Sequence, residues 1–101
     1  MNTHDMIRVL EIAHRNPSFT RSEAGFRLFL TVGSLALERT AGSIKKHVFR
    51  LFFDIMIREM VKWVGKQGEL EAEFVECCQH MLPKCAGEPL HKAIRAYLRL
   101  R

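Results

Sequence analysis

The stretch SIKKHVFRLFFDIMIREMVKWV, residues 43–64, decides the fold class of this chain. Charged side chains recur in it at every fourth residue and so form one line along a helix. They are Lys46, Arg50, Asp54, Arg58 and Lys62. Most of the remaining circumference is apolar, and a helix of this kind must be covered on most sides. The side chains expected to face the core are Ile44, Val48, Leu51, Phe52, Ile55, Met56, Met60 and Trp63. The sequence therefore predicts a long central helix over about 43–64, covered within the monomer or across a homodimer interface.

Shorter helices are expected before this central helix. Apolar residues at helical spacing predict a first helix over Thr3–Arg15, which the dipeptide Asn16-Pro17 ends. The run Thr20-Arg21-Ser22-Glu23 has the form of a capping box and predicts a second helix that starts there. Glycines weaken that helix, so the range 26–32 also fits a strand, and a break is expected near Gly33.

Two helices are expected after the central one. The first has Leu70, Phe74, Cys77, Cys78 and Met81 on its apolar face and ends at Pro83. The dipeptide Glu88-Pro89 opens the last helix. Its expected inward residues are Leu90, Ala93, Ile94 and Tyr97, and its expected outward residues are Lys92, Arg95 and Arg99. The sequence therefore predicts an all-α compact bundle of four to five helices, in a single domain over residues 1–101.

The chain is basic. Its 101 residues include 16 Lys and Arg against 11 Asp and Glu, for a formal net charge of +5. Four of the acids fall between Glu69 and Glu76, so the rest of the chain is more basic than the total implies. A basic surface favours polyanionic partners, nucleic acid above all.

The segment before and into the central helix resembles a helix-turn-helix in outline. We expect a short helix, a turn containing Gly42, and a helix whose first turns expose basic side chains. The side chains of this segment that we expect to contact phosphates or base edges are Arg39, Lys45, Lys46, His47 and Arg50. The length and apolar character of the central helix favour the alternative, in which these residues are the solvated stripe of a core helix.

The last helix offers a second basic surface. Lys92, Arg95 and Arg99 would contact phosphates, and each contact would steepen the salt dependence of binding. A second explanation is that basic residues near the end of a helix complement its dipole. Both explanations stay open at the level of sequence.

Cysteine and histidine form the one cluster with metal-ligand chemistry, at Cys77, His80, Cys85 and His91. These residue types suit zinc, but the spacing matches no standard zinc pattern, and Cys77 and Cys78 also complete an apolar stripe. We therefore expect no bound metal and no cofactor, with zinc as the alternative, and we expect Cys85 to be the exposed thiol.

Three cysteines with no export signal favour a cytoplasmic, reducing compartment. The longest uncharged run, Leu28–Leu37, is far shorter than the ~20 apolar residues of a membrane helix, so no membrane association is expected.

No phosphate-binding glycine loop, nucleophile elbow or metalloprotease helix is present in the sequence. We therefore expect a regulatory protein that binds nucleic acid through a helix-turn-helix-like or basic helical surface, not an enzyme. The alternative is a helical adaptor or inhibitor that docks on a larger protein or nucleoprotein complex, suggested by the many Phe and Met residues of the central helix.

Overall fold

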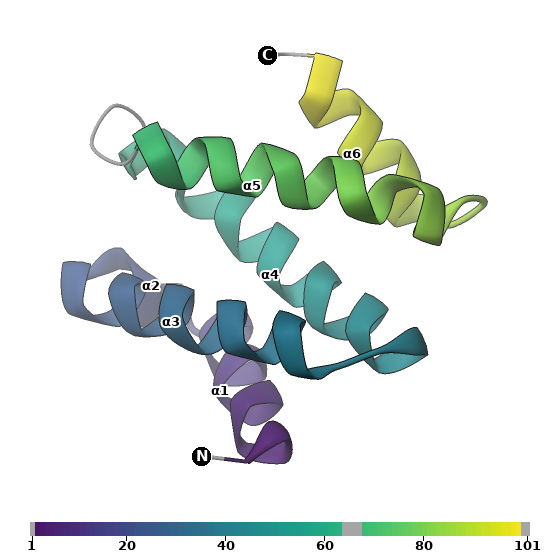
Figure 1. Ribbon diagram of the computed structural model, residues 1–101. Helices are drawn as coiled ribbons and strands as arrows, with labels where there is room; N and C mark the ends of the chain where they lie inside the picture. Colours follow the sequence, from purple (N-terminus) through teal and green to yellow (C-terminus); the bar gives the residue numbers. More distant parts are fainter. Residues whose placement is uncertain (1, 64–67, 100–101) are drawn as a thin grey trace. The chain divides into compact units, whose positions relative to one another are not determined.

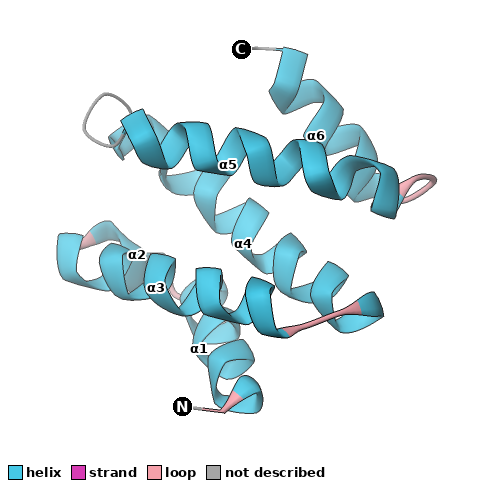
Figure 2. Cartoon of the chain, in the orientation of Figure 1, coloured by secondary structure: helices cyan, strands magenta, loops and turns pink. Residues whose placement is uncertain are grey.

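The computed structural model describes residues 2–63 and 68–99, together with their side chains except those of 60–63, 68–71, 73 and 74. Every regular element in these ranges is helical, as Figures 1 and 2 show. The expected all-α class is confirmed. The described residues form six α-helices and one 3₁₀-helix instead of four to five helices, because residues 17–21 form a helix of their own.

The chain divides into two compact units, residues 1–62 and 63–101. The single domain and the wrapping of a central helix stay predictions. Of the helices described, none has the length and apolar character that crossing a membrane requires.

The first unit begins with α1 (Thr3–Arg15), as expected, followed by the short α2 (Pro17–Arg21). The Asn2 side chain caps α1 by accepting a hydrogen bond from the Asp5 amide at 2.8 Å. Pro17 ends α1 but also starts α2, because its fixed φ suits the first position of a helix. Only the first of these two roles was predicted from the sequence.

The predicted capping box at Thr20 is wrong, because α3 (Glu23–Arg39) starts after Ser22. The Ser22 hydroxyl accepts a hydrogen bond from the Gly25 amide at 3.1 Å, and Glu23 pairs with Arg27 one turn later at 2.9 Å. Thr20 is fully buried, and its hydroxyl donates instead to the carboxylate of Glu59. A distant tertiary contact therefore removes Thr20 from the capping role.

α3 runs unbroken through Phe26–Val32 and Gly33, so neither the alternative strand nor the break is present. Gly33 is buried where α3 meets the long helix α4 (Gly42–Trp63). A Cβ atom there would lie 2.4 Å from Cδ2 of Phe52, whose ring stacks on Phe29 at a centroid distance of 5.0 Å. The glycine therefore permits close packing of two helices instead of interrupting one.

The bounds of α4 agree with the predicted central helix to within one residue at each end. Most of its expected core residues with described side chains are buried, including Val48, Phe52 and Ile55. Ile44 is an exception: 55% of it is exposed, because it lies in the first turn of the helix. Met60 and Trp63 fall outside the described side chains.

The second unit contains α5 (Gly68–Met81), the 3₁₀-helix Leu82–Cys85 and α6 (Pro89–Arg99). α5 and α6 each contact the 3₁₀-helix and each other. The buried side chains of this unit, among those described, are Cys78, Met81, Cys85, Leu90, Ile94 and Tyr97. Ala93, expected to face inward, is exposed. The predicted contacts of Leu70 and Phe74 lie outside the described side chains.

Candidate functional site

The outer face of α6 gathers the three predicted cations Lys92, Arg95 and Arg99. At 100° per residue the three lie within an arc of about 60° of the helix, and along its axis they span about 10.5 Å. All three are exposed, whereas Leu90, Ile94 and Tyr97 on the opposite face are buried. No hydrogen bond or ion pair joins the three cations to any residue that the structure describes. α6 therefore has one face that packs the unit and one that presents positive charge to solvent.

The helix dipole accounts for only part of this pattern. Arg99 alone lies in the last turn of α6, where a cation is favoured. Lys92 follows Pro89 by three residues, near the positive end of the helix dipole, and no acid is present in the first turn. The dipole therefore explains Arg99 but not Lys92 or Arg95, which lie on the solvated face that an amphipathic helix always has.

A shallow hollow of about 280 Å³ lies along this face. It is lined by His91, Lys92, Arg95, Ala96 and Arg99. The small Ala96 keeps the helix surface low between long side chains, so that an anionic group can approach them. None of the lining residues is acidic, so the hollow is suited to an anion such as phosphate.

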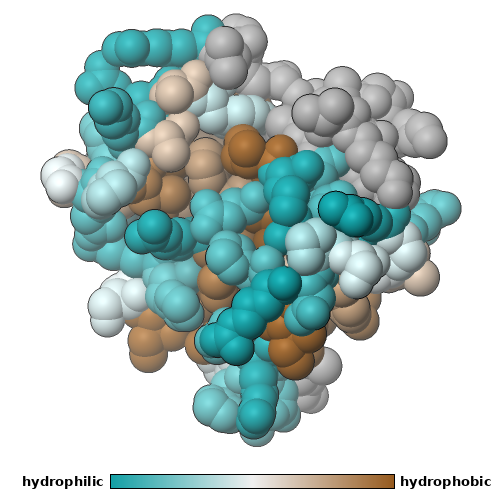
Figure 3. Space-filling view, turned by 180° about the vertical axis from the view of Figure 1, so that it is seen from behind, coloured by the Kyte–Doolittle hydropathy of each residue, from teal (hydrophilic) through white to brown (hydrophobic). Residues whose placement is uncertain are grey.

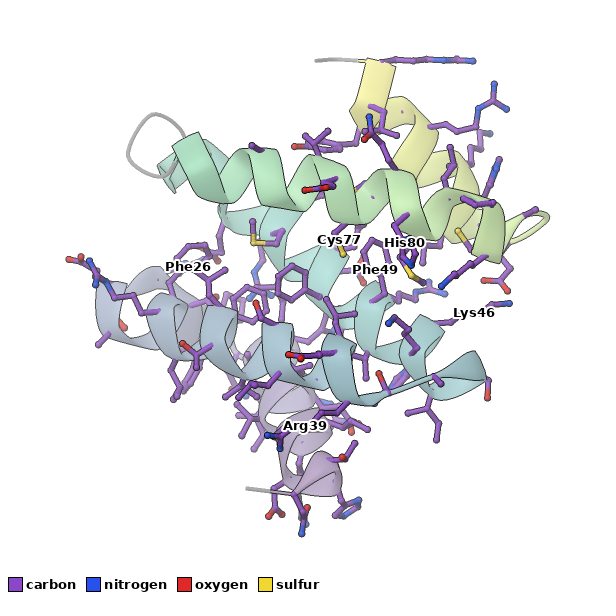
Figure 4. All side chains as sticks on the ribbon, viewed as in Figure 1. Phe26, Arg39, Lys46, Phe49, Cys77 and His80 are labelled. Atoms are coloured by element: carbon purple, nitrogen blue, oxygen red, sulfur yellow. The ribbon has the colours of Figure 1, made fainter. Side chains whose placement is uncertain are left out.

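The predicted basic residues around the start of α4 do not share one face. Lys46, His47 and Arg50 span an arc of about 100°, but Lys45 lies about 100° further back around the helix. Arg39, at the end of α3, is exposed, and its side chain does not converge with that of Lys46 (Figure 4). Lys45 and Lys46 are half-buried, and His47 and Arg50 are exposed. This basic segment is therefore more diffuse than the α6 face.

The expected helix-turn-helix is only partly present. α3 has 17 residues, so the helix before the turn is not the short one that was predicted. Thr40 and Ala41 link it to α4, which begins at Gly42 with φ +61°, in the left-handed region that favours glycine. The second helix is confirmed, but its predicted contact residues are spread around it.

Sequence reasoning missed a buried polar cluster in the first unit. The carboxylate of Glu59, a residue 4% exposed, accepts hydrogen bonds from the Thr20 hydroxyl and from Nε of Arg58, each at 3.1 Å. The Arg58 guanidinium also donates to the backbone oxygens of Ala13 and His14, at 3.0 and 2.8 Å. Carbonyls at the end of a helix lack partners within it, so Arg58 caps α1.

A second contact joins the same two helices. Nε2 of His14 lies 3.0 Å from Oδ2 of Asp54, and both side chains are about 40% exposed. Asp54 and Arg58 were expected to belong to a solvated charged line, but both hold α1 against α4. Lys46 and Arg50, which precede Asp54 in the charged line, do not belong to these contacts between α1 and α4.

The zinc candidates are not arranged as a ligand set. Within the described residues, no three His, Cys, Asp or Glu side chains gather as a metal ion requires. Cys85 is fully buried in the 3₁₀-helix, and its thiol donates to the backbone oxygen of Met81 at 3.3 Å, so its predicted exposure is wrong. His80 accepts from Nζ of Lys84 at 3.0 Å, and His91 lies along the α6 hollow.

Burial suppresses the ionisation of one thiol of this unit, that of Cys78. Burial, and secondly the neighbouring Cys77, raises the pKa of Cys78 to about 12. The pKa of Tyr97 is raised by burial first and by Cys78 second. A thiol that keeps its proton is a poor nucleophile and a poor metal ligand, so Cys78 acts as a small core residue.

No protein-family model, curated protein or solved structure matches the chain. The function is therefore argued from its residues and their geometry.

Proposed function

We propose that this chain is a nucleic-acid-binding protein that uses the outer face of α6 as its main contact surface. The observation that carries the proposal is the set of three exposed cations on one side of one helix, with no ion partner among the described residues. Such a surface neutralises phosphates, which supply most of the affinity for nucleic acid. The basic residues at the start of α4 contribute a second, weaker surface.

The proposal describes a binding protein with a regulatory role, not an enzyme. The three cysteines are free thiols, which supports a reducing compartment such as the cytoplasm. Groove readers are commonly dimers, and a homodimer is part of the proposal. The central helix gives the homodimer little support, because its large apolar side chains are already buried within one chain and are not left for a second copy. They include Phe49, Phe52, Phe53 and Met56.

The adaptor alternative has less support for the same reason. Among the side chains that the structure describes, four large apolar ones are exposed, and they come from three helices: Ile12, Leu28, Ile44 and Ile57. Single exposed apolar residues are ordinary on protein surfaces. On the face drawn in Figure 3, hydrophilic side chains cover much of the surface between the hydrophobic ones. A protein partner would become the better proposal if nucleic acid did not bind.

The test is a titration against a labelled DNA duplex at low and at physiological salt. We expect the wild-type protein to bind, and the double variant Lys92→Glu, Arg95→Glu to lose most of that affinity. The variant Arg8→Glu, Arg15→Glu is the matched control, because it reverses two exposed charges on α1 and should bind like wild type. Absence of wild-type binding at low salt would overturn the proposal, and so would equal losses in the two variants.

A third variant ranks the two surfaces. Lys45→Glu with Lys46→Glu should weaken binding less than the α6 variant does, because these two side chains are half-buried and point in different directions around α4. Helicity by circular dichroism should be unchanged in all variants.

A further inference from the structure

The α6 face differs from a helix that reads bases. Recognition helices present their N-terminal residues to base edges in the major groove. α6 begins with Pro89, which has no backbone N–H to donate, and its second residue, Leu90, is buried, so its N-terminal end offers few groups to base edges. Its cations lie further along the helix, on its side. The geometry is that of a helix that lies along a nucleic-acid strand instead of entering a groove with its N-terminus.

The spacing of the cations fits a phosphate backbone. The three charges span about 10.5 Å along the helix axis. A strand of duplex DNA carries one phosphate charge per about 3.4 Å of axis, so about three phosphates fall in that length. Because the strand also winds around that axis, its phosphates lie further apart than this rise, and the long Lys and Arg side chains can spread from α6 to reach consecutive phosphates.

The hollow on this face has few of the groups that read bases. Its lining contains no Asn or Gln, the side chains that pair with adenine, and no Phe, Tyr or Trp on which an unpaired base would stack. Arg and Lys also pair with guanine, but Arg95 and Arg99 would do so only if this side of α6 entered the major groove. The lining is cationic with one small apolar floor residue, Ala96. Its polar chemistry is therefore matched to phosphate oxygens.

We infer that the α6 face holds the phosphodiester backbone of a duplex without regard to base sequence. This inference rests on the proposed function and adds what α6 recognises. Sequence preference, if the protein has any, then comes from another surface and is unchanged by substitutions in α6.

The experiment uses two labelled DNA duplexes of equal length, one rich in A·T and one rich in G·C, titrated over a series of salt concentrations. We expect Arg95→Gln to weaken binding to both duplexes by the same factor, on the order of tenfold. The slope of log affinity against log salt is negative, and it should become less steep by about 0.9 for each cation removed; Arg99→Gln should behave alike. Arg8→Gln is the control, with the same loss of charge and no change in slope.

The outcomes separate the two claims. If the wild-type protein binds neither duplex at low salt, the proposed function fails and this inference with it. If it binds but Arg95→Gln lowers affinity for one duplex only, α6 reads bases, and the inference fails while the proposed function stands. A loss without any change in the salt slope would also overturn the inference. An RNA duplex as a third probe should show the same dependence on Arg95, because its backbone carries the same phosphates.

Discussion

The second half of α4 and the outer face of α6 both carry charges at helical spacing, and they use them differently. In α4, Arg58 and Glu59 are held by each other, by Thr20 and by the end of α1. In α6, Lys92 and Arg95 are exposed and have no partner among the described residues. The first set joins helices of one unit, whereas the second lies on the surface. Charge spacing in a sequence does not distinguish these two cases, but the surroundings of each charge do.

The largest expected effect is that of Arg58→Ala. The substitution leaves the buried Glu59 carboxylate without its cation and uncaps the last carbonyls of α1, so the free energy of unfolding should fall by about 3 kcal/mol. Urea denaturation followed by circular dichroism measures the change. Arg95→Ala is the matched control and should shift stability by no more than about 0.5 kcal/mol. If both variants lost the same free energy of unfolding, the charges of α4 and α6 would not differ in their contribution to stability.

The regular parts of the fold could be predicted from the sequence. The bounds of α1 and α4 follow from apolar periodicity, Pro17 and Gly42, which act locally. The cap of α3 could not be predicted in this way. Thr20 and Ser22 are both good capping residues, and only the contact of Thr20 with Glu59, 39 residues away, decides between them.

The candidate site was predictable to a similar degree. The amphipathic pattern of α6 gave its three outward cations directly. The role of Arg58 was not accessible, because its place in a charged line is the same as that of Arg50, and the carbonyls that it caps lie 44 and 45 residues away. The burial of Cys85 also depends on packing around the 3₁₀-helix, where the sequence pattern gives no periodicity to interpret.

An intermediate effect is expected from raising the pH, which should lower the stability of the second unit through its buried Cys78. An unfolded chain releases the Cys78 proton near pH 9.0, whereas the folded protein keeps it up to a pKa of about 12. Between these values the folded state holds a proton that the unfolded state has lost, so stability falls as the pH rises. Tyr97 contributes in the same direction. Urea unfolding below pH 9 and between 9 and 12 measures the slope.

The variant Cys78→Ala isolates the thiol contribution to that slope. It removes the titrating group but leaves Tyr97, so stability should fall less steeply with pH than in the wild-type protein. The same slope in both proteins would show that Cys78 is not protected from ionisation.

The smallest expected effect is that of Asp54→Asn. The contact with His14 is about 40% exposed on both sides, and exposed ion pairs contribute about 0–1 kcal/mol. Urea denaturation should therefore show a loss well below that of Arg58→Ala. A loss as large as that of Arg58→Ala would place the main tie between α1 and α4 at His14 instead of at Arg58.

The most direct test of the account measures duplex affinity and stability on one variant, Lys92→Gln with Arg95→Gln and Arg99→Gln. If the α6 charges serve a ligand, affinity should fall and its dependence on salt should become less steep by about 2.7 in slope, with stability lowered by no more than about 1 kcal/mol. Unchanged affinity together with a marked loss of stability would contradict the account, because the α6 charges would then hold the fold as those of α4 do.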